Sequence, residues 1–226
     1  MLSRVVGIDS ARFVALVHDE SFVHSLGINA HSLEGYLLPD TYTFQWQTDE
    51  QALITTLVTE YRRFYTDSLQ ARANGLDWTT NQVMTLASIV EGEAVLQEER
   101  PVISGVYHNR LRKGMKLEAD PTLRYVIDGG PRRILYSDLQ IESPYNTYRY
   151  RGLPPGPINN PGRASILAAL FPARHNYLFF VANGKGGHWF TSTYAEHMRY
   201  VRQYRRERNI REAGSLTDTN GRPAAR

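Results

Sequence analysis

The stretch Ala87-Ser88-Ile89-Val90-Glu91-Gly92-Glu93-Ala94 is a largely apolar helical segment that carries two glutamates around a glycine. A mid-helix glycine costs about 1 kcal/mol relative to alanine, so Gly92 indicates a packing or access requirement. The apolar stripe of this helix consists of Val83, Leu86, Ala87, Val90 and Ala94. Centred near Val83, the stripe places Glu91 and Glu93 about 80° to either side, at its two edges. Periodicity therefore does not choose between them, and by itself it favours two ordinary solvent-facing charges.

Helix signals continue on both sides of this segment, and two short strands follow. The expected helices are a short one capped by Asp9 or Ser10, a second ending at Gly27, one from Thr48 or Asp49 to Asn74-Gly75, the central one capped by Thr79 or Thr80, and others at about Pro101–Lys113, Pro121–Ile127, Pro161–Leu170 and Thr193–Arg208. Residues 177–181 and 188–191 are predicted as strands around a hairpin turn at 183–187. Helices outnumber strands, and the strands form a hairpin, so the predicted class is α+β.

Residues 117–161 are rich in proline, glycine, asparagine and tyrosine and are predicted to be mostly loop. A loop of this length inside a compact domain is usually functional. Tyr145, Asn146 and Tyr148 combine apolar faces with polar tips, which suits sugar rings. A structural loop with buried tyrosines is the alternative, and Asp120 is equally explained as the cap of the helix after it.

Composition narrows the functional classes. The 226 residues are 42% hydrophobic and 11% aromatic, which supports a sizeable core and argues against disorder. With no cysteine, disulfides, thiol catalysis and cysteine-ligated zinc are excluded. The seven histidines lack ligand spacing, so neither a metal nor a cofactor is expected. The net charge of +3 is concentrated late in the chain, where a solvated surface is preferred over a nucleic-acid site.

Five segments, in order, resemble the endolytic murein transglycosylase family, also called MltG or YceG-like. They are LEGYLLPDTYTF (33–44), ASIVEGEA (87–94), ERPVISGVYHNRLRKGMKLEADPT (99–122), SPYNTYRYRGLPPGPINNPG (143–162) and YLFFVANGKGGHWF (177–190). The chain departs from the family at Gly92, where lysine is common, and at Glu118-Ala119, where glutamine and a small hydroxyl residue are common. These departures concern substrate details more than the reaction.

The resemblance implies an enzyme that cuts peptidoglycan glycan strands internally, with Glu93 as its catalytic acid and base. It implies residues 34–207 as a helix-rich catalytic domain and residues 1–33 as the remnant of a preceding subdomain. The composition of residues 208–226 predicts a basic, disordered tail. The residues expected to bind substrate are Glu91, Asp120, Tyr145, Asn146, Tyr148 and His188. Glu91 is also expected to support the cleft or to cap a neighbouring backbone group.

The family further implies an extracytoplasmic protein, tethered to the cell membrane by an anchor that would precede Met1, and contact with the wall-elongation and division machinery. Ordinary glycosidases use two carboxyl groups about 5–10 Å apart, whereas Glu91 and Glu93 point about 200° apart around their helix. A lytic transglycosylase needs one glutamate, because the muramoyl C6 hydroxyl replaces water. A hydrolytic muramidase and a non-catalytic glycan-binding module remain as alternatives.

Overall fold

The computed structural model describes residues 7–130 and 132–218, with only the backbone described for 212–218. Its helices and strands are α2 (Ser10–Val17), α3 (Glu20–Ser25), α4 (Glu50–Phe64), α5 (Asp67–Asn74), α6 (Thr80–Glu93), η1 (Gln97–Glu99), α7 (Arg100–Arg112), α8 (Asp120–Val126), η2 (Asp138–Gln140), α9 (Arg163–Leu170), β1 (Phe179–Ala182), β2 (His188–Thr191) and α10 (Tyr194–Asp218). β1 and β2 form an antiparallel hairpin in which Phe180 pairs with Phe190. The predicted α+β class is confirmed.

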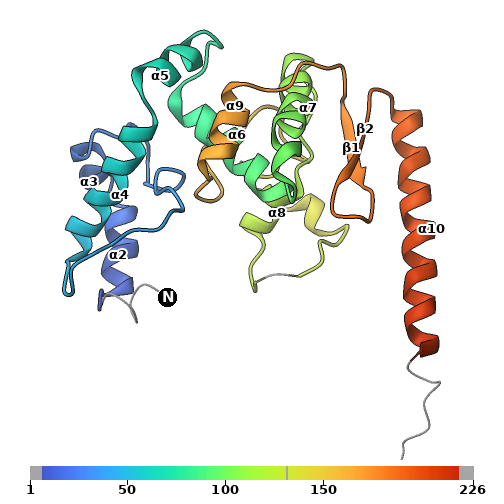
Figure 1. Ribbon diagram of the computed structural model, residues 1–226, viewed down its shortest axis with the longest axis horizontal. Helices are drawn as coiled ribbons and strands as arrows, with labels where there is room; N and C mark the ends of the chain where they lie inside the picture. Colours follow the sequence, from blue (N-terminus) through green and yellow to red (C-terminus); the bar gives the residue numbers. More distant parts are fainter. Residues whose placement is uncertain (1–6, 131, 219–226) are drawn as a thin grey trace, which may run out of the picture.

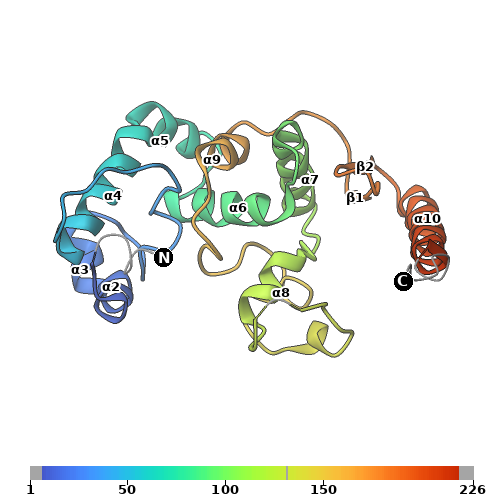
Figure 2. The ribbon, with the colours of Figure 1, turned by 60° about the horizontal axis from the view of Figure 1, so that its bottom comes forward.

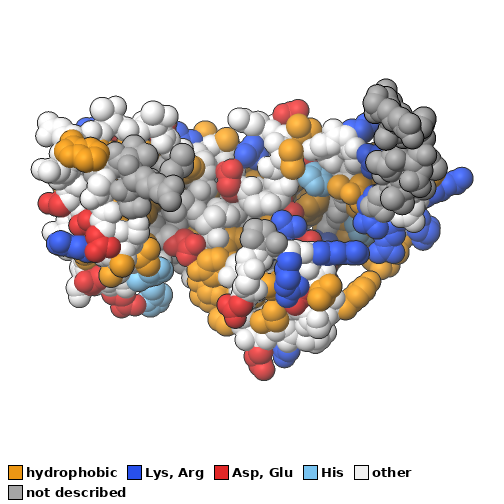
Figure 3. All heavy atoms as spheres, turned by 90° about the horizontal axis from the view of Figure 1, so that it is seen from below, with side chains coloured by type: hydrophobic (Ala, Val, Ile, Leu, Met, Phe, Trp, Pro, Cys, Tyr) orange, Lys and Arg blue, Asp and Glu red, His pale blue; other side chains and the backbone are white. Residues whose placement is uncertain are grey.

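The molecule is elongated, with its elements placed along it almost in chain order (Figures 1 and 2). Helices α2, α3 and α4 form one end, α6, α7 and α9 form the middle, and the hairpin with α10 forms the other end. Lys and Arg side chains gather at the α10 end, as the clustering of positive charge late in the sequence predicts (Figure 3). None of the helices within the described ranges combines the length and the apolarity needed to cross a membrane.

Helix α6 is the centre of the fold. Its N-terminus has a capping box, in which the Thr79 hydroxyl accepts the Gln82 N–H and the Gln82 side chain accepts the Thr79 N–H. Residues 83–90 are all buried, because α5, α7, α8 and α9 pack around the helix. The buried surface of α6 is therefore wider than the single apolar stripe expected from the sequence. The two glutamates lie in the last turn, where this enclosure ends.

Gly92 has a packing reason. A Cβ atom at this position would lie 2.7 Å from the Cβ of Pro121, closer than two carbon atoms can approach. Glycine therefore lets the first turn of α8 rest directly on the backbone of α6. The prediction that Gly92 serves packing is confirmed, and this contact brings Asp120, the first residue of α8, to the same turn as Glu93.

Several boundaries differ from those expected, and α9, for example, begins at Arg163 rather than at Pro161. The helix predicted to run from Asp49 to Asn74 is two helices, α4 and α5, because Thr66 is extended (φ −73°, ψ 168°) and begins a new helix as its N-cap. Strand β1 begins two residues later than expected, at Phe179. Helix α10 continues to Asp218, so residues 208–218 of the predicted disordered tail are helical. Residues 1–6 and 219–226 lie outside the described residues.

The N-terminal segment packs on the rest of the chain rather than standing apart. Helix α2 packs against α4, and the Leu33 N–H donates to the Val17 carbonyl. Val23 and Leu33 are fully buried in the same hydrophobic cluster as α6. The boundary expected at residue 33 therefore crosses a shared core, and the division into domains stays a prediction.

Candidate active site

A cavity of about 320 Å³ opens beside the C-terminal end of α6. Four of the predicted site residues line it together: Glu93, Asp120, Tyr148 and His188. The other residues around it are Tyr107, Arg110, Leu117, Glu118, Phe180, Val181, Ala182 and His197. One pocket thus collects side chains from α6, α7, α8, the hairpin and the loop 143–162, here called the tyrosine-rich loop. These parts of the chain lie up to about 100 residues apart in the sequence.

Glu93 has the properties of a proton donor. Burial raises the pKa of its carboxyl group from 4.5 to about 7, against the opposing effect of a hydrogen bond from Tyr107 and with the help of the nearby negative charge of Asp120. The Tyr107 hydroxyl donates to Glu93 Oε1 at 2.8 Å. Within the described residues, Oε2 has no hydrogen-bond partner. Near neutral pH a large fraction of Glu93 therefore carries a proton.

Glu91 has the opposite character and lies outside the pocket. Its Oε2 accepts hydrogen bonds from the Gly162 N–H at 3.0 Å and the Ser165 hydroxyl at 2.7 Å, and Arg100 donates to Oε1 at 3.2 Å. Burial acts to raise the pKa of Glu91, but these three partners outweigh it and lower the pKa. Glu91 therefore stays ionised at the N-terminus of α9, where a negative charge is favourable.

Two roles were expected for Glu91, as a cap of a backbone group and as a substrate contact. It accepts a backbone N–H, as one prediction held, and it does not line the Glu93 pocket, so its contact with substrate stays a prediction. The helical geometry explains the difference, because the two side chains leave opposite edges of α6. One edge faces α9, and the other faces α7 and α8.

Asp120 and Tyr148 form a hydrogen-bonded pair on the pocket wall. The Tyr148 hydroxyl donates to Asp120 Oδ1 at 2.6 Å. Burial raises the pKa of Tyr148, and the bond to the Asp120 carboxylate raises it further, so the phenol keeps its proton. Asp120 makes no side-chain cap to α8, although it is the first residue of that helix. The simpler explanation of Asp120 as a helix cap is therefore wrong.

Asn146 supports the tyrosine-rich loop from inside. Its side chain is fully buried, its Nδ2 donates to the carbonyls of Leu139 and Ile141, and its Oδ1 accepts the Tyr148 N–H at 3.0 Å. Because this side chain has no exposed surface, its position favours a structural role, and direct sugar contact stays a prediction. Asn146 sets the backbone position of Tyr148.

Tyr145 lies away from Glu93. Its ring packs against Tyr125, with centroids 4.8 Å apart, and it lines a different cavity of about 470 Å³ that also includes Glu34. The Tyr125 hydroxyl donates to Glu34 Oε2 at 2.7 Å. The loop therefore presents Tyr148 to the Glu93 pocket and Tyr145 to a neighbouring surface. Whether Tyr145 contacts substrate stays a prediction.

Sequence reasoning missed Tyr107, Arg110 and Glu99. Tyr107 and Arg110 are three residues apart on α7 and share the helix face that meets Glu93. Arg110 is buried and donates to the Leu178 carbonyl at 2.6 Å and to Glu118 at 3.0 Å. The signal available was a tyrosine and an arginine three residues apart in a predicted helix.

Glu99 positions His188 at the pocket. Its Oε1 accepts the His188 N–H at 2.8 Å, and its Oε2 lies 2.7 Å from Nδ1 of the same histidine. Both side chains are largely buried. The pair therefore joins the start of α7 to strand β2 and fixes the imidazole orientation. Within the described residues no group of three or more histidine, aspartate or glutamate side chains is placed to hold a metal ion.

Fold and site together define a helix-rich α+β protein with one protonatable glutamate among tyrosines, and two further carboxyl groups, Glu118 and Asp120, in the same pocket. The model of the YceG-like family matches residues 6–203, and the chain belongs to that family. The matched range contains every residue of the Glu93 pocket and also α2 and α3.

Named relatives and a solved structure agree with this placement. The endolytic murein transglycosylase of Bacillus subtilis is 38% identical over 179 residues, which cover 79% of this chain and 50% of the relative. The protein of the same name from Streptococcus pneumoniae is 29% identical over 85% of this chain and 38% of the relative. A crystal structure of a yceG-like protein from Listeria monocytogenes superimposes with a TM-score of 0.78 at 34% identity, covering 87% of this chain and 70% of that one. The chain thus spans half or less of the curated relatives.

Proposed function

We propose that this chain carries the active site of an endolytic lytic transglycosylase that cuts peptidoglycan glycan strands between N-acetylmuramic acid and N-acetylglucosamine. The observation that supports this most is the pKa of about 7 of Glu93 in a pocket, on a chain whose relatives are named endolytic murein transglycosylases. General acids work best when their pKa lies near the working pH, and burial gives Glu93 that property.

The reaction uses the same carboxyl group twice. Protonated Glu93 donates its proton to the glycosidic oxygen while the bond from that oxygen to the muramoyl C1 breaks. The Glu93 carboxylate then accepts the proton of the muramoyl C6 hydroxyl, whose oxygen bonds to C1. The products are a 1,6-anhydromuramoyl end and a new N-acetylglucosamine end, and no water is consumed. Because the attack is intramolecular, orientation of the sugar supplies much of the rate.

The other pocket residues hold substrate and tune the acid. The free Asp120 carboxylate oxygen and the Tyr148 hydroxyl oxygen offer acceptors to sugar hydroxyls, and His188 adds a further polar group on the hairpin side. Tyr107 donates to Glu93 in either protonation state and stabilises the carboxylate after the first proton transfer. The hydrogen bond leaves Oε2 to face the substrate.

A hydrolytic muramidase is the second candidate, and Asp120 is the observation that favours it. A second carboxyl group in the pocket is what a glycosidase that activates water requires. The two reactions share the first proton transfer and differ in the nucleophile. Incorporation of solvent oxygen into the product separates them.

The wider biological setting follows from the same proposal. Peptidoglycan is extracytoplasmic, so the enzyme would act outside the cytoplasm, held at the cell membrane and acting with the wall-elongation and division machinery. The catalytic unit would span residues 34–207. Cofactors and nucleic acid have no place in this reaction.

Turnover of two matched variants tests the assignment of the acid. Glu93→Gln keeps the shape of the side chain and the acceptor for Tyr107 but has no proton to donate. We expect it to fold and to lose activity by at least the 10²–10⁴-fold that general acid catalysis supplies. Glu91→Gln is expected to retain far more activity, since Glu91 lies outside the pocket. Near-normal turnover in folded Glu93→Gln contradicts the proposal.

A further inference from the structure

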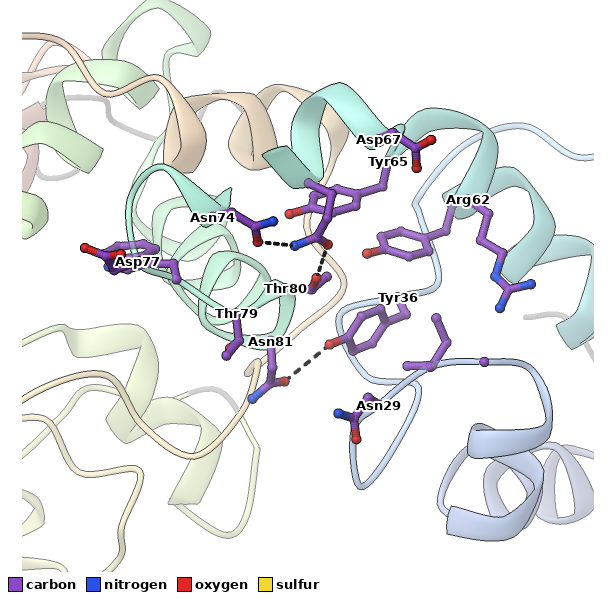
Figure 4. Close-up of a pocket in the computed structure, with 15 residues that line it drawn as sticks. Asn29, Tyr36, Arg62, Tyr65, Asp67, Asn74, Asp77, Thr79, Thr80 and Asn81 are labelled. Atoms are coloured by element: carbon purple, nitrogen blue, oxygen red, sulfur yellow. Dashed lines mark hydrogen bonds between the residues drawn. The ribbon is translucent and has the colours of Figure 1, made fainter. Parts of the chain in front are cut away.

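A second large cavity lies at the opposite end of α6 from Glu93. Its volume is about 960 Å³, and α4, α5, the Asn29 loop and the start of α6 surround it (Figure 4). In Figure 4, Tyr36 and Asn81 reach toward each other from two walls of this cavity. Neither the acid chemistry at Glu93 nor the residues around it use this space.

A group of tyrosines in this cavity has unsatisfied hydrogen-bonding capacity. Tyr61 is 3% exposed, and within the described residues its hydroxyl has no hydrogen-bond partner. The Tyr36 hydroxyl makes a long bond of 3.4 Å to Asn81 Oδ1. The Tyr61 ring lies between those of Tyr36 and Tyr65, with centroids 5.3 Å and 5.6 Å away. An unpaired buried hydroxyl is costly and uncommon, which points to a ligand that completes the set.

The remaining polar groups specify the chemistry of that ligand. Asp67 and Asp77 line the cavity, and in the described ranges neither side chain has a hydrogen bond or an ion pair. Arg62 also lines the cavity, so the two carboxylates leave the lining with one net negative charge, which disfavours an anion. The carboxylates accept hydrogen bonds from neutral hydroxyl and amide groups. Aromatic rings beside such acceptors suit the apolar faces of sugar rings. The N-acetylglucosamine unit of the strand, which is uncharged and N-acetylated, fits this combination, whereas the N-acetylmuramic acid unit of a stripped strand carries a lactyl carboxylate.

The cavity is placed to hold the same strand that is cut at Glu93. The helix from Thr80 to Glu93 has 14 residues, which corresponds to about 20 Å, or several sugar units. Asn29 and Asn81 also line the 470 Å³ cavity that contains Tyr145. The two cavities are therefore adjacent, and they extend toward α8, whose first residue lines the Glu93 pocket.

The cavity between α4, α5 and the start of α6 is here called the distal pocket. We propose that it binds saccharide units of the glycan strand that lie several sugar units away from the bond that Glu93 cleaves. This assignment rests on the proposed function. It gives the enzyme a preference for long strands, because short fragments reach only one of the two pockets.

Binding to a variant that cannot cut separates the distal pocket from the chemistry. Glu93→Gln is titrated with uncrosslinked glycan strands stripped of peptide, and with the disaccharide repeat alone. The same titration is repeated after adding Tyr61→Phe and Asp77→Asn, which remove one hydroxyl and one charge from the distal pocket. Tyr136→Phe with Asp128→Asn is the matched control, since both side chains are exposed and outside every pocket named above.

We expect the distal-pocket changes to weaken binding of long strands about tenfold, while disaccharide binding and the control stay unchanged. The melting temperature is expected to stay the same or to rise, because the lost Tyr61 hydroxyl had no partner. Unchanged affinity for long strands, or equal loss for long strands and disaccharide, overturns the proposal. Binding of free stem peptides in place of stripped strands overturns its saccharide chemistry.

The same data distinguish this proposal from the proposed function. If the unmodified protein leaves glycan strands uncut while the distal-pocket variant still binds them more weakly, the lytic reaction is wrong and the binding site is right. If strands are cut normally and the distal-pocket changes have no effect on binding, the reaction stands and the site does not.

Discussion

Replacing Glu93 with glutamine removes a carboxyl group that burial keeps protonated up to about pH 7. The unfolded chain releases this proton near pH 4.5, so between the two values the folded state holds more protons and stability falls as pH rises. The rise of the pKa from 4.5 to about 7 corresponds to about 3 kcal/mol, which is an upper limit because the side chain is partly exposed. Glutamine carries no proton that pH can remove and still accepts the Tyr107 bond.

Folded Glu93→Gln is therefore expected to be more stable than the unmodified protein at pH 8, by up to about 3 kcal/mol, and equally stable below pH 4.5. For a chain of this size that difference corresponds to a melting temperature about 6–12 °C higher at pH 8. Urea unfolding followed by circular dichroism at several pH values measures the effect directly. An enzyme that becomes more stable when its acid is removed shows that the acid is held in an unfavourable environment.

Glu91→Gln provides a control of opposite sign. The pKa of Glu91 is lowered, so its stabilising effect is present above the unfolded pKa and is lost as pH falls through the folded value. Its glutamine variant is expected to be less stable at pH 8, by about 1–3 kcal/mol from weakened charged hydrogen bonds. Parallel stability curves for Glu93→Gln and the unmodified protein from pH 4 to 8 refute the raised pKa.

Three further variants test other parts of the site. Gly92→Ala is expected to destabilise the protein by about 1–3 kcal/mol in urea unfolding despite its better helix propensity, because the new methyl group meets Pro121; equal or higher stability contradicts this packing. Tyr107→Phe is expected to move the alkaline limb of kcat/KM to higher pH, since the lost hydrogen bond lowered the pKa of Glu93; an unmoved limb argues against Glu93 as the acid. Asn146→Ala is expected to destabilise by about 2–4 kcal/mol in thermal unfolding through three lost buried hydrogen bonds; a loss of affinity with normal stability restores Asn146 as a substrate contact.

Local signals were enough to predict the framework of the fold. Caps, glycines and prolines marked the helices around α6, and the Asn183–Gly187 turn marked the hairpin. The break between α4 and α5 was missed because apolar spacing continues across Thr66, whose capping role depends on its extended backbone. The end of α10 was placed too early because its last residues are small and polar, which suggests disorder in the absence of tertiary contacts.

Single site residues could be predicted from the sequence only where a chemically suitable residue lies inside a segment that resembles the family. Glu93 could be chosen from the family resemblance but not from periodicity, because both glutamates lie at the edges of an apolar helix. What separates them is the neighbouring element on each side, which is α9 beside Glu91 and α7 beside Glu93, and α9 is distant from α6 in the sequence. The role of Asn146 could not be assigned from the sequence, because an asparagine between tyrosines gives the same pattern whether it binds sugar or holds a loop.

The fate of solvent oxygen tests the central claim most directly. Uncrosslinked glycan strands are digested in water enriched in heavy oxygen, and the new ends are analysed by mass spectrometry. The account predicts 1,6-anhydromuramoyl ends that contain no heavy oxygen, and no such ends with Glu93→Gln. Reducing muramic acid ends that carry one heavy oxygen atom would show that water is the nucleophile, and would replace the transglycosylase with a muramidase.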